Sequence, residues 1–238
     1  MRGLVSLLLS LALTASAAGA WADEATVKKA FQAKFPKARV ESVTRTPYLG
    51  LYEVVVEGQV FYTDEPFSFL VDGNIIETRN LANVTEERRK KLAAVKFDSL
   101  PLEWAFKTVK GDGRRKLAIF SDPDCPFCRR LEEELVKVTN VTLYTFLYPL
   151  ESLHPAAPEK ARRIWCSADP AKAWGDLILS GTNPRATDKC DNPVDKIVKL
   201  GQKLRITGTP TLFFADGQRV PGAISAAQLE KALDAASR

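Results

Sequence analysis

Two cysteines, Cys125 and Cys128, stand three positions apart where an apolar run gives way to a helical pattern. The run at residues 117–121 predicts a buried strand, and the residues that follow Cys128 predict a helix. A thiol at a helix N-terminus faces unpaired amides and the positive end of the helix dipole, which favour the thiolate. The second cysteine lies about one turn away, so it can attack a mixed disulfide that the first has formed. This segment therefore predicts a redox-active pair.

The two thiols have different expected roles, because only the first can sit on the exposed turn while the second points back under the helix. Cys125 is the expected nucleophile and Cys128 the expected resolving thiol. The ordinary thiol pKa near 8.5 falls to about 3.5–7.5 in such settings. The two arginines that follow the pair would lower the pKa of Cys125, whereas Asp122 and Asp124 would raise it. The sequence does not decide which effect is larger.

Two other uses of the cysteine pair have to be weighed. A permanent disulfide is one, although a three-residue spacing at a strand-to-helix junction is typical of redox pairs. A zinc half-site is the other, and it needs two further Cys or His ligands. The only histidine, His154, precedes Pro155 in a loop and is expected to be a surface residue. No metal site and no cofactor are predicted.

The N-terminus has the pattern of an export signal. Arg2 is followed by an apolar run over residues 4–18 and then by Ala20-Trp21-Ala22. A charged start, a short apolar core and an Ala-x-Ala site predict a secretory signal over residues 1–22, cleaved after Ala22. A membrane anchor needs about 20 apolar residues, and this run is shorter, so no stable anchor is expected. In an exported chain, an even number of cysteines favours disulfides over reduced thiols.

Cysteine usage separates the mature chain into two parts, because residues 23–84 contain none. This front part begins with a short amphipathic helix over residues 24–35. Strand patterns separated by turn signals such as Glu57-Gly58 follow, at residues 40–44, 51–56, 60–62, 67–71 and 75–78. We expect a small antiparallel sheet with one helix. A linker helix over residues 85–98 is predicted next, with Thr85 as its N-cap.

The C-terminal part, residues 99–238, alternates between strand and helix patterns. It opens with predicted strands at 104–109, 117–121 and 141–148 and a helix at 127–138. Three helical patterns follow, at 158–167, 171–179 and 193–204. The chain ends with strands at 211–214 and 218–220 and a helix at 226–235. A β-α-β opening and a β-β-α ending predict a thioredoxin-like α/β domain with a helical insertion, and the whole chain is expected to have an α+β fold.

The charge pattern gives no sign of a polyanionic partner. The formal net charge is +5, and Lys and Arg are scattered among Asp and Glu. The densest basic cluster, residues 86–91, mixes both signs at helical spacing and predicts a solvated helix face. No nucleic-acid partner is expected.

Two further features lie beyond the redox pair. Cys166 and Cys190 could close a loop of about 25 residues as a structural disulfide, and a second redox pair is the alternative. Thr209 and Pro210 precede an apolar strand, where proline cannot donate to a ladder. A cis bond before Pro210 would expose the backbone of Thr209 at the strand edge, and an extended substrate could pair there next to Cys125.

These motifs together resemble the bacterial periplasmic thiol:disulfide interchange proteins of the DsbC/DsbG family, over nearly the whole mature chain. The resemblance rests on Phe120-Ser121-Asp122-Pro123-Asp124-Cys125-Pro126-Phe127-Cys128, Ile164-Trp165-Cys166, Cys190, Thr207-Gly208-Thr209-Pro210 and Val220-Pro221-Gly222. It implies a cystatin-like N-terminal domain, residues 23–84, through which two copies form a homodimer. It also implies a periplasmic location, an apolar cleft between facing catalytic domains, and a DsbD-type membrane reductase that keeps the active site reduced.

The resemblance also implies roles for individual residues. Cys125 would attack wrongly paired disulfides of misfolded or mis-oxidised exported proteins, and Cys128 would resolve stalled mixed disulfides. Cys166 would pair with Cys190. Substrate would bind alongside the cysteines at Thr209, Pro210, Pro126 and Phe127.

The implied activity is that of a disulfide isomerase or reductase with chaperone activity. The isomerase of the family usually has Gly-Tyr between its cysteines and its paralogue has Pro-Tyr. Pro126-Phe127 is closer to the paralogue, and a proline there removes an amide at the start of the helix. A DsbG-like chaperone or sulfenic-acid reductase, and a DsbA-like thiol oxidant, therefore stay open.

Overall fold

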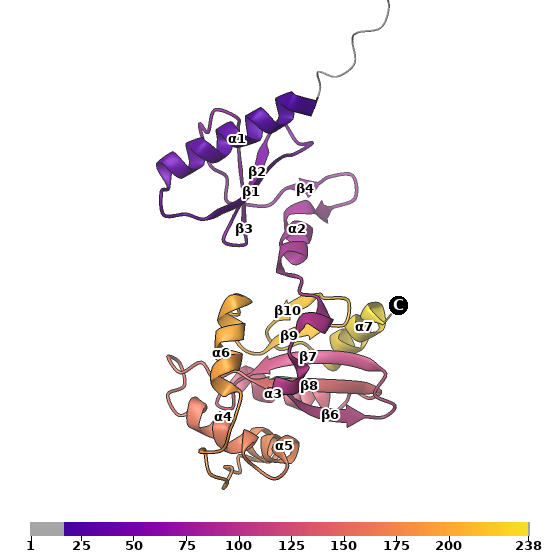
Figure 1. Cartoon of the computed structure of the whole chain (residues 1–238). Coiled ribbons are helices and arrows are strands. Elements are labelled where there is room, and N and C mark those ends of the chain that lie inside the picture. The colour runs from indigo at the N-terminus through magenta and orange to yellow at the C-terminus, as the bar shows by residue number, and fades with distance from the viewer. Residues whose placement is uncertain (1–16, 238) are drawn as a thin grey trace, which may run out of the picture. The chain divides into compact units, whose positions relative to one another are not determined.

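The computed structural model describes residues 17–237, with side chains described from residue 23 onward. The chain divides into two compact units, and the division falls between Leu92 and Ala93 (Figure 1). The predicted export signal lies outside the described residues up to residue 16, and only the backbone of residues 17–22 is described, as the start of helix α1 (Ala17–Lys34). Within residues 17–237, no helix is long and apolar enough to cross a membrane.

The N-terminal unit is built on a three-stranded antiparallel sheet in the order β1-β2-β3. Its strands are β1 (Val40–Arg45), β2 (Tyr52–Val56) and β3 (Gln59–Thr63). Glu57 and Gly58 connect β2 to β3, and both have positive φ (51° and 81°), as a tight hairpin turn of type I′ requires. Helix α1 packs on this sheet through a small core that contains Val27, Phe31, Val40, Tyr52 and Val54.

The prediction of a strand at residues 67–71 of this unit is wrong. The segment is a loop whose backbone pairs with β3 at an isolated bridge between Val71 and Tyr62. Local polar contacts hold the loop: the Thr63 hydroxyl donates to the Phe69 carbonyl at 2.6 Å, and the Asp64 carboxylate accepts from the Ser68 amide at 2.7 Å. Phe67 has a φ of 57°, which is outside the strand region. Side-chain bonds to the backbone therefore compete successfully with the ladder that the apolar pattern predicts.

A short pair of strands, β4 (Ile76–Glu77) and β5 (Ala82–Asn83), leads into helix α2 (Val84–Ala93). The helix ends well before residue 98, the end of the predicted linker helix. Thr85 is not its N-cap, because its buried hydroxyl bonds the Tyr62 hydroxyl at 2.6 Å and accepts from the Ile75 amide at 2.9 Å. Asn83 caps the helix instead, since its side-chain oxygen accepts a hydrogen bond from the Glu86 amide at 2.9 Å.

The C-terminal unit contains a five-stranded sheet in the order β10-β9-β7-β8-β6. Strands β7 and β8 are parallel, and the other neighbours are antiparallel. This is the mixed sheet of a thioredoxin-like domain. The strands are β6 (Phe106–Lys110), β7 (Arg115–Ser121), β8 (Val141–Leu147), β9 (Thr211–Phe214) and β10 (Arg219–Pro221). Two short 3-10 helices, η1 (Phe97–Ser99) and η2 (Leu102–Trp104), precede β6.

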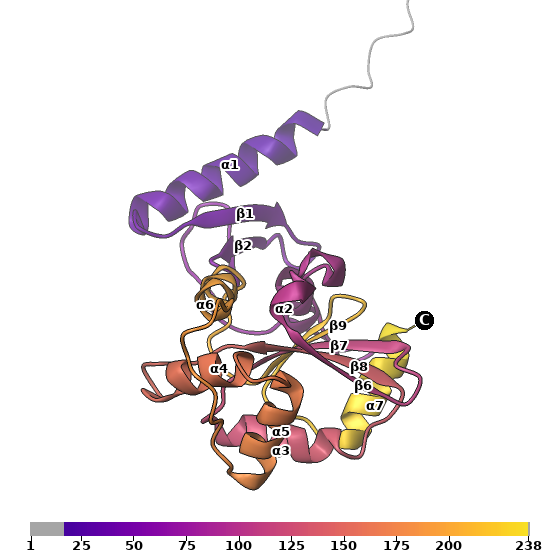
Figure 2. The ribbon, with the colours of Figure 1, turned by 60° about the horizontal axis from the view of Figure 1, so that its bottom comes forward.

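Alternating side chains of the central strand β7 supply two separate cores, as a strand buried on both faces should. Leu117 and Ile119 pack with helices α3 (Pro126–Leu135) and α7 (Ala226–Ala236). Ala118 and Phe120 pack on the other face with Ile197 of helix α6 (Val194–Lys203). Figure 2 shows α6 on one side of the sheet and α3 and α7 on the other.

The helical insertion between β8 and β9 also contains α4 (Ala157–Trp165) and α5 (Pro170–Ser180). These helices contribute to a third apolar cluster, in which Ile164 and Trp174 lie with Cys125 and Cys128. The insertion thus supplies part of the wall around the two thiols.

Candidate active site

Helix α3 begins at the first cysteine of the pair. Cys125 is the N-cap, with extended backbone angles (φ −79°, ψ 121°), and Pro126 occupies the first turn. Proline is well suited there, because its missing N–H would have had no partner inside the helix. The amides of Cys128 and Arg129 donate to the Cys125 carbonyl at 3.1 and 3.2 Å. The sequence therefore sets the thiol of Cys125 at the positive end of the helix.

The two cysteines are free thiols that differ in access to solvent. Cys128 is fully buried, and its sulfur accepts a hydrogen bond from the Asp122 amide at 3.4 Å. Cys125 retains 5% exposure, which is less than an open turn would give. The exposed residues of the motif are Pro126 and Phe127, and Phe127 is 56% exposed. Cys125 is thus the more accessible of the two sulfur atoms.

Thr209 lies directly against Cys125. The Thr209-Pro210 bond is cis, and the Cys125 thiol donates to the Thr209 carbonyl oxygen at 3.3 Å. The Thr209 hydroxyl is buried and has no hydrogen-bond partner in the part of the chain that the structure describes. A buried orphan donor needs a physical explanation, and a thiolate at Cys125 would be its acceptor. The Thr209 carbonyl therefore accepts from the Cys125 thiol, and the Thr209 hydroxyl can donate to the Cys125 thiolate.

The thiol pKa values diverge strongly. The pKa of Cys125 falls well below the ordinary thiol value, to about 5, chiefly because the Cys128 thiol donates a hydrogen bond to its thiolate. The Thr209 side chain and the Phe127 and Cys128 amides also donate to that thiolate and lower the pKa further, while burial opposes them. The pKa of Cys128 is raised, first by burial and then by the same hydrogen bond to Cys125.

The cause of the low Cys125 pKa differs from the balance of side-chain charges that the sequence suggests. Arg129 and Arg130 are both exposed, and direct hydrogen bonds to the sulfur are the larger effects. These hydrogen bonds depend on the folded structure, because the start of α3 supplies Phe127 and Cys128 as donors and the loop before β9 supplies Thr209.

One feature of the site was missed by sequence reasoning: the pairing of His154 with Asp122. His154 was expected to be a surface residue, but its side chain is only 22% exposed and its Nδ1 lies 3.0 Å from Oδ2 of Asp122. The Asp122 side chain is fully buried. The signal available in the sequence was a carboxylate placed directly after a buried strand, where a buried charge needs a partner.

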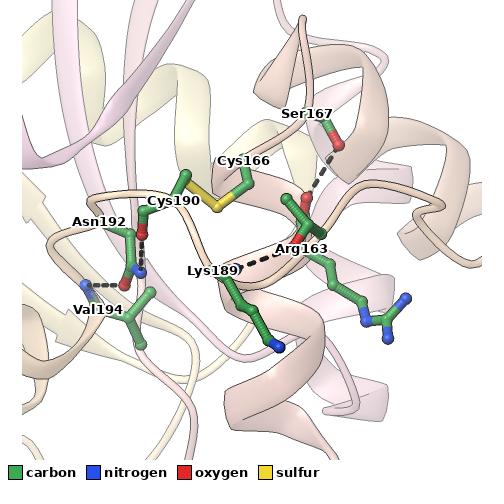
Figure 3. The surroundings of a disulfide bond; sticks show 8 residues. Arg163, Cys166, Ser167, Lys189, Cys190, Asn192 and Val194 are labelled. Carbon is green, nitrogen blue, oxygen red and sulfur yellow. Dashed lines mark hydrogen bonds between the residues drawn. A yellow bond between two sulfur atoms is a disulfide. The ribbon is translucent and has the colours of Figure 1, made fainter.

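Cys166 and Cys190 are joined by a disulfide that spans 24 positions (Figure 3). It fastens the end of α4 to the loop before α6. The Asn192 side chain holds that loop, since it donates to the Cys190 carbonyl at 2.9 Å and accepts from the Val194 amide at 3.3 Å. The Ser167 hydroxyl donates to the Arg163 carbonyl at 2.9 Å on the other side of the bridge.

Residues 17–237 contain no cluster of three or more His, Cys, Asp or Glu side chains that could hold a metal ion. The free thiols of Cys125 and Cys128 are the candidate reactive groups. Their unequal pKa values and exposure define a thiol:disulfide oxidoreductase on a thioredoxin-like sheet.

Comparison with known proteins agrees with this class. Residues 102–237 match a thioredoxin-like domain, and residues 18–86 match the disulfide bond isomerase protein N-terminal domain. The chain is 44% identical over 207 residues to a probable thiol:disulfide interchange protein DsbC of Bordetella pertussis, covering 87% of this chain and 73% of that protein. It is 23% identical over 226 residues to the thiol:disulfide interchange protein DsbC of Escherichia coli, covering 93% and 92%.

A solved structure is also similar to part of this chain. The disulfide interchange protein from Neisseria gonorrhoeae is 45% identical with a TM-score of 0.56, covering 58% of this chain and 99% of that one. The chain described here belongs to the DsbC family of thiol:disulfide interchange proteins. Its activity is disulfide isomerase or oxidoreductase activity.

Proposed function

We propose that Cys125 is the attacking thiolate and Cys128 the resolving thiol in the isomerisation or reduction of non-native disulfides in exported proteins. The observation that carries this assignment is the opposite shift of the two thiol pKa values, downward for Cys125 and upward for Cys128. At neutral pH the first sulfur is a thiolate and the second keeps its proton. Only a thiolate attacks a disulfide, so Cys125 acts first.

The exchange conserves electrons at each step. The Cys125 thiolate forms a bond to one sulfur of a substrate disulfide, the substrate S–S bond breaks, and the other substrate sulfur leaves as a thiolate. That thiolate can attack a different substrate disulfide, which forms a new substrate S–S bond and frees another substrate thiolate. When this second thiolate attacks the substrate sulfur of the mixed disulfide, a further substrate disulfide forms and Cys125 leaves as a thiolate, with no net oxidation. If the mixed disulfide persists, Cys128 loses its proton and attacks Cys125, which leaves the substrate reduced and the Cys125–Cys128 pair oxidised.

Substrate binding involves four residues around the sulfur. Exposed Pro126 and Phe127 offer apolar contact next to Cys125. The carbonyl oxygen of Thr209, which precedes Pro210, is within hydrogen-bond distance of the sulfur. An extended substrate chain that pairs with the backbone at Thr209 would present its disulfide to Cys125.

The wider setting is proposed from the family. The protein works in the periplasm after removal of residues 1–22, as a homodimer through a domain over residues 23–84. A linker over residues 85–98 joins this domain to the catalytic domain over residues 99–238. A DsbD-type membrane reductase returns the oxidised pair to the dithiol, and its two electrons restore the thiols of Cys125 and Cys128.

Refolding of scrambled ribonuclease tests the assignment. Cys125→Ser should abolish the recovery of ribonuclease activity, and Cys128→Ser should accumulate mixed disulfides through Cys125. Full activity of Cys125→Ser would refute the assignment. Alkylation trapping in cells then gives the direction of electron flow: a mostly reduced pair supports an isomerase or reductase, and a mostly oxidised pair supports a disulfide donor.

A further inference from the structure

A buried carboxylate lies three residues before the nucleophile and takes no part in the exchange itself. The Asp122 side chain is fully buried. Its Oδ1 accepts from the Asp124 amide at 2.8 Å, and its Oδ2 accepts from the Leu150 amide at 2.6 Å. Oδ2 also lies 3.0 Å from Nδ1 of His154. Asp122 therefore ties the turn that carries Cys125 to the loop between β8 and α4.

His154 is fixed in that loop by its own backbone. Its amide donates to the Leu150 carbonyl at 2.8 Å, and its carbonyl accepts from the Ala157 amide at 3.0 Å. Because its neighbours hold the backbone, the imidazole stays in place whether it is neutral or charged. Both states can donate from Nδ1 to Asp122, but only the imidazolium cancels the charge of the carboxylate.

The charges around this imidazole are mostly negative. The negative charges of Asp122, Asp124 and Cys125 all act on it. Lys160 of α4, a nearby cation, forms a salt bridge with Asp124, with 2.5 Å between Nζ and Oδ1. The pKa of His154 is raised, chiefly by its hydrogen bond to Asp122. The imidazolium of His154 is therefore favoured close to Cys125, whose thiolate adds a second negative charge to that of Asp122.

We propose that His154 is a positioning residue for exchange at Cys125: its imidazolium neutralises the buried Asp122 carboxylate and so favours the negative charge of the Cys125 thiolate. This proposal rests on the proposed role of Cys125. The physical reason is that a like charge close to a titrating group disfavours its ionisation, and an added opposite charge restores it. When His154 loses its proton, its hydrogen bond to Asp122 remains. The negative charge of Asp122 is then no longer neutralised, and it disfavours the Cys125 thiolate.

The variant His154→Asn separates charge from hydrogen bonding. The asparagine amide can donate from about the position of Nδ1 but never carries a charge. In the reduced full chain, thiolate absorbance measured against pH should show the Cys125 pKa raised by about half a unit or more, which is a threefold or greater loss of thiolate on the acid side. Lys172→Gln, which removes an exposed positive charge from α5, is the matched control and should leave this pKa unchanged.

A second measurement needs no variant, because the chain has a single histidine whose imidazole resonance is unambiguous. Coupling between two sites is reciprocal. In the unmodified, untagged protein the His154 pKa measured by NMR should therefore be higher in the reduced form, which holds the thiolate, than in the oxidised form. Equal His154 pKa values in the two redox states, or an unchanged Cys125 pKa in His154→Asn, would overturn the proposal.

These readouts are independent of catalysis. If Cys125→Ser retained refolding activity, the proposed function would fail while the coupling between His154 and Cys125 could still be present. If Cys125→Ser is inactive and the coupling is absent, only the role of His154 is refuted.

Discussion

The sulfur of Cys125 donates a hydrogen bond to the carbonyl oxygen of Thr209, 3.3 Å away across 84 positions of sequence. The hydroxyl of the same threonine is buried and has no hydrogen-bond partner among the described residues. One residue can therefore accept from the thiol and donate to the thiolate. This relationship connects the cis-proline loop to the reactivity of the first cysteine.

Thr209→Val should raise the pKa of Cys125, because valine keeps the shape of threonine and loses the hydroxyl donor. Loss of one hydrogen bond to a thiolate corresponds to a rise of about half a unit to one unit. Thiolate absorbance as a function of pH measures the change. Thr207→Val, at an exposed position two residues earlier, should behave as the unmodified protein. Equal pKa values in the two variants would exclude a role for the Thr209 hydroxyl.

Stability of the reduced protein should depend on pH through Cys125. Its pKa is about 5 in the folded chain and about 8.5 when unfolded, so folding favours the thiolate. The resulting stabilisation is present in full above the unfolded pKa and is lost as the pH falls through about 5. Denaturant unfolding under reducing conditions should show the free-energy difference between the unmodified chain and Cys125→Ser growing from acid to neutral pH. A difference that does not change with pH would contradict the low pKa.

Much of the C-terminal unit could be predicted from sequence, because its signals are local and agree with one another. The strand before Cys125 and the helix after it are separated by residues with clear turn and N1 preferences, and they form as predicted. The failures came where polar side chains form hydrogen bonds that the sequence pattern does not reveal. Thr85 is bonded to Tyr62 rather than capping a helix, and loop 67–71 is held by polar contacts that the apolar pattern hides.

The site was predictable in its residue types but not in its energetics. The Cys-x-x-Cys spacing predicts two thiols with different roles. Thr209, one of the donors that lower the Cys125 pKa, and His154, which pairs with Asp122, come from segments distant in sequence. No periodicity or spacing encodes such a contact.

Removal of the second cysteine pair should destabilise the catalytic unit without removing the exchange chemistry. Cys166 and Cys190 span 24 positions, and a loop of that size corresponds to about 3 to 4 kcal/mol in the chain-entropy treatment. A Cys166→Ala/Cys190→Ala double variant should show this loss in denaturant unfolding. Its Cys125 should still be alkylated at the rate of the unmodified chain when folded. A loss of Cys125 reactivity in the folded variant would indicate that the pair relays electrons.

Two glycines give a matched pair of stability tests. A methyl group on Gly201 of α6 would overlap the ring of Tyr148, whereas one on Gly175 of α5 would meet no atom within 4 Å. Gly201→Ala should cost about 1–3 kcal/mol of unfolding free energy through overpacking. Gly175→Ala should instead stabilise by about 0.5–1 kcal/mol through helix propensity. If both variants shifted the unfolding midpoint equally, the tight contact between α6 and Tyr148 would be disproved.

The most direct test of the account is the pH dependence of alkylation at each cysteine of the reduced protein, followed by mass analysis of the labelled peptides. We expect Cys125 to be modified quickly, with a rate that rises through an inflection near pH 5. Cys128 should stay protected throughout, because it is fully buried and its pKa is raised. An inflection near the ordinary thiol pKa of about 8.5, or faster modification of Cys128, would contradict the assignment of Cys125 as the attacking thiolate.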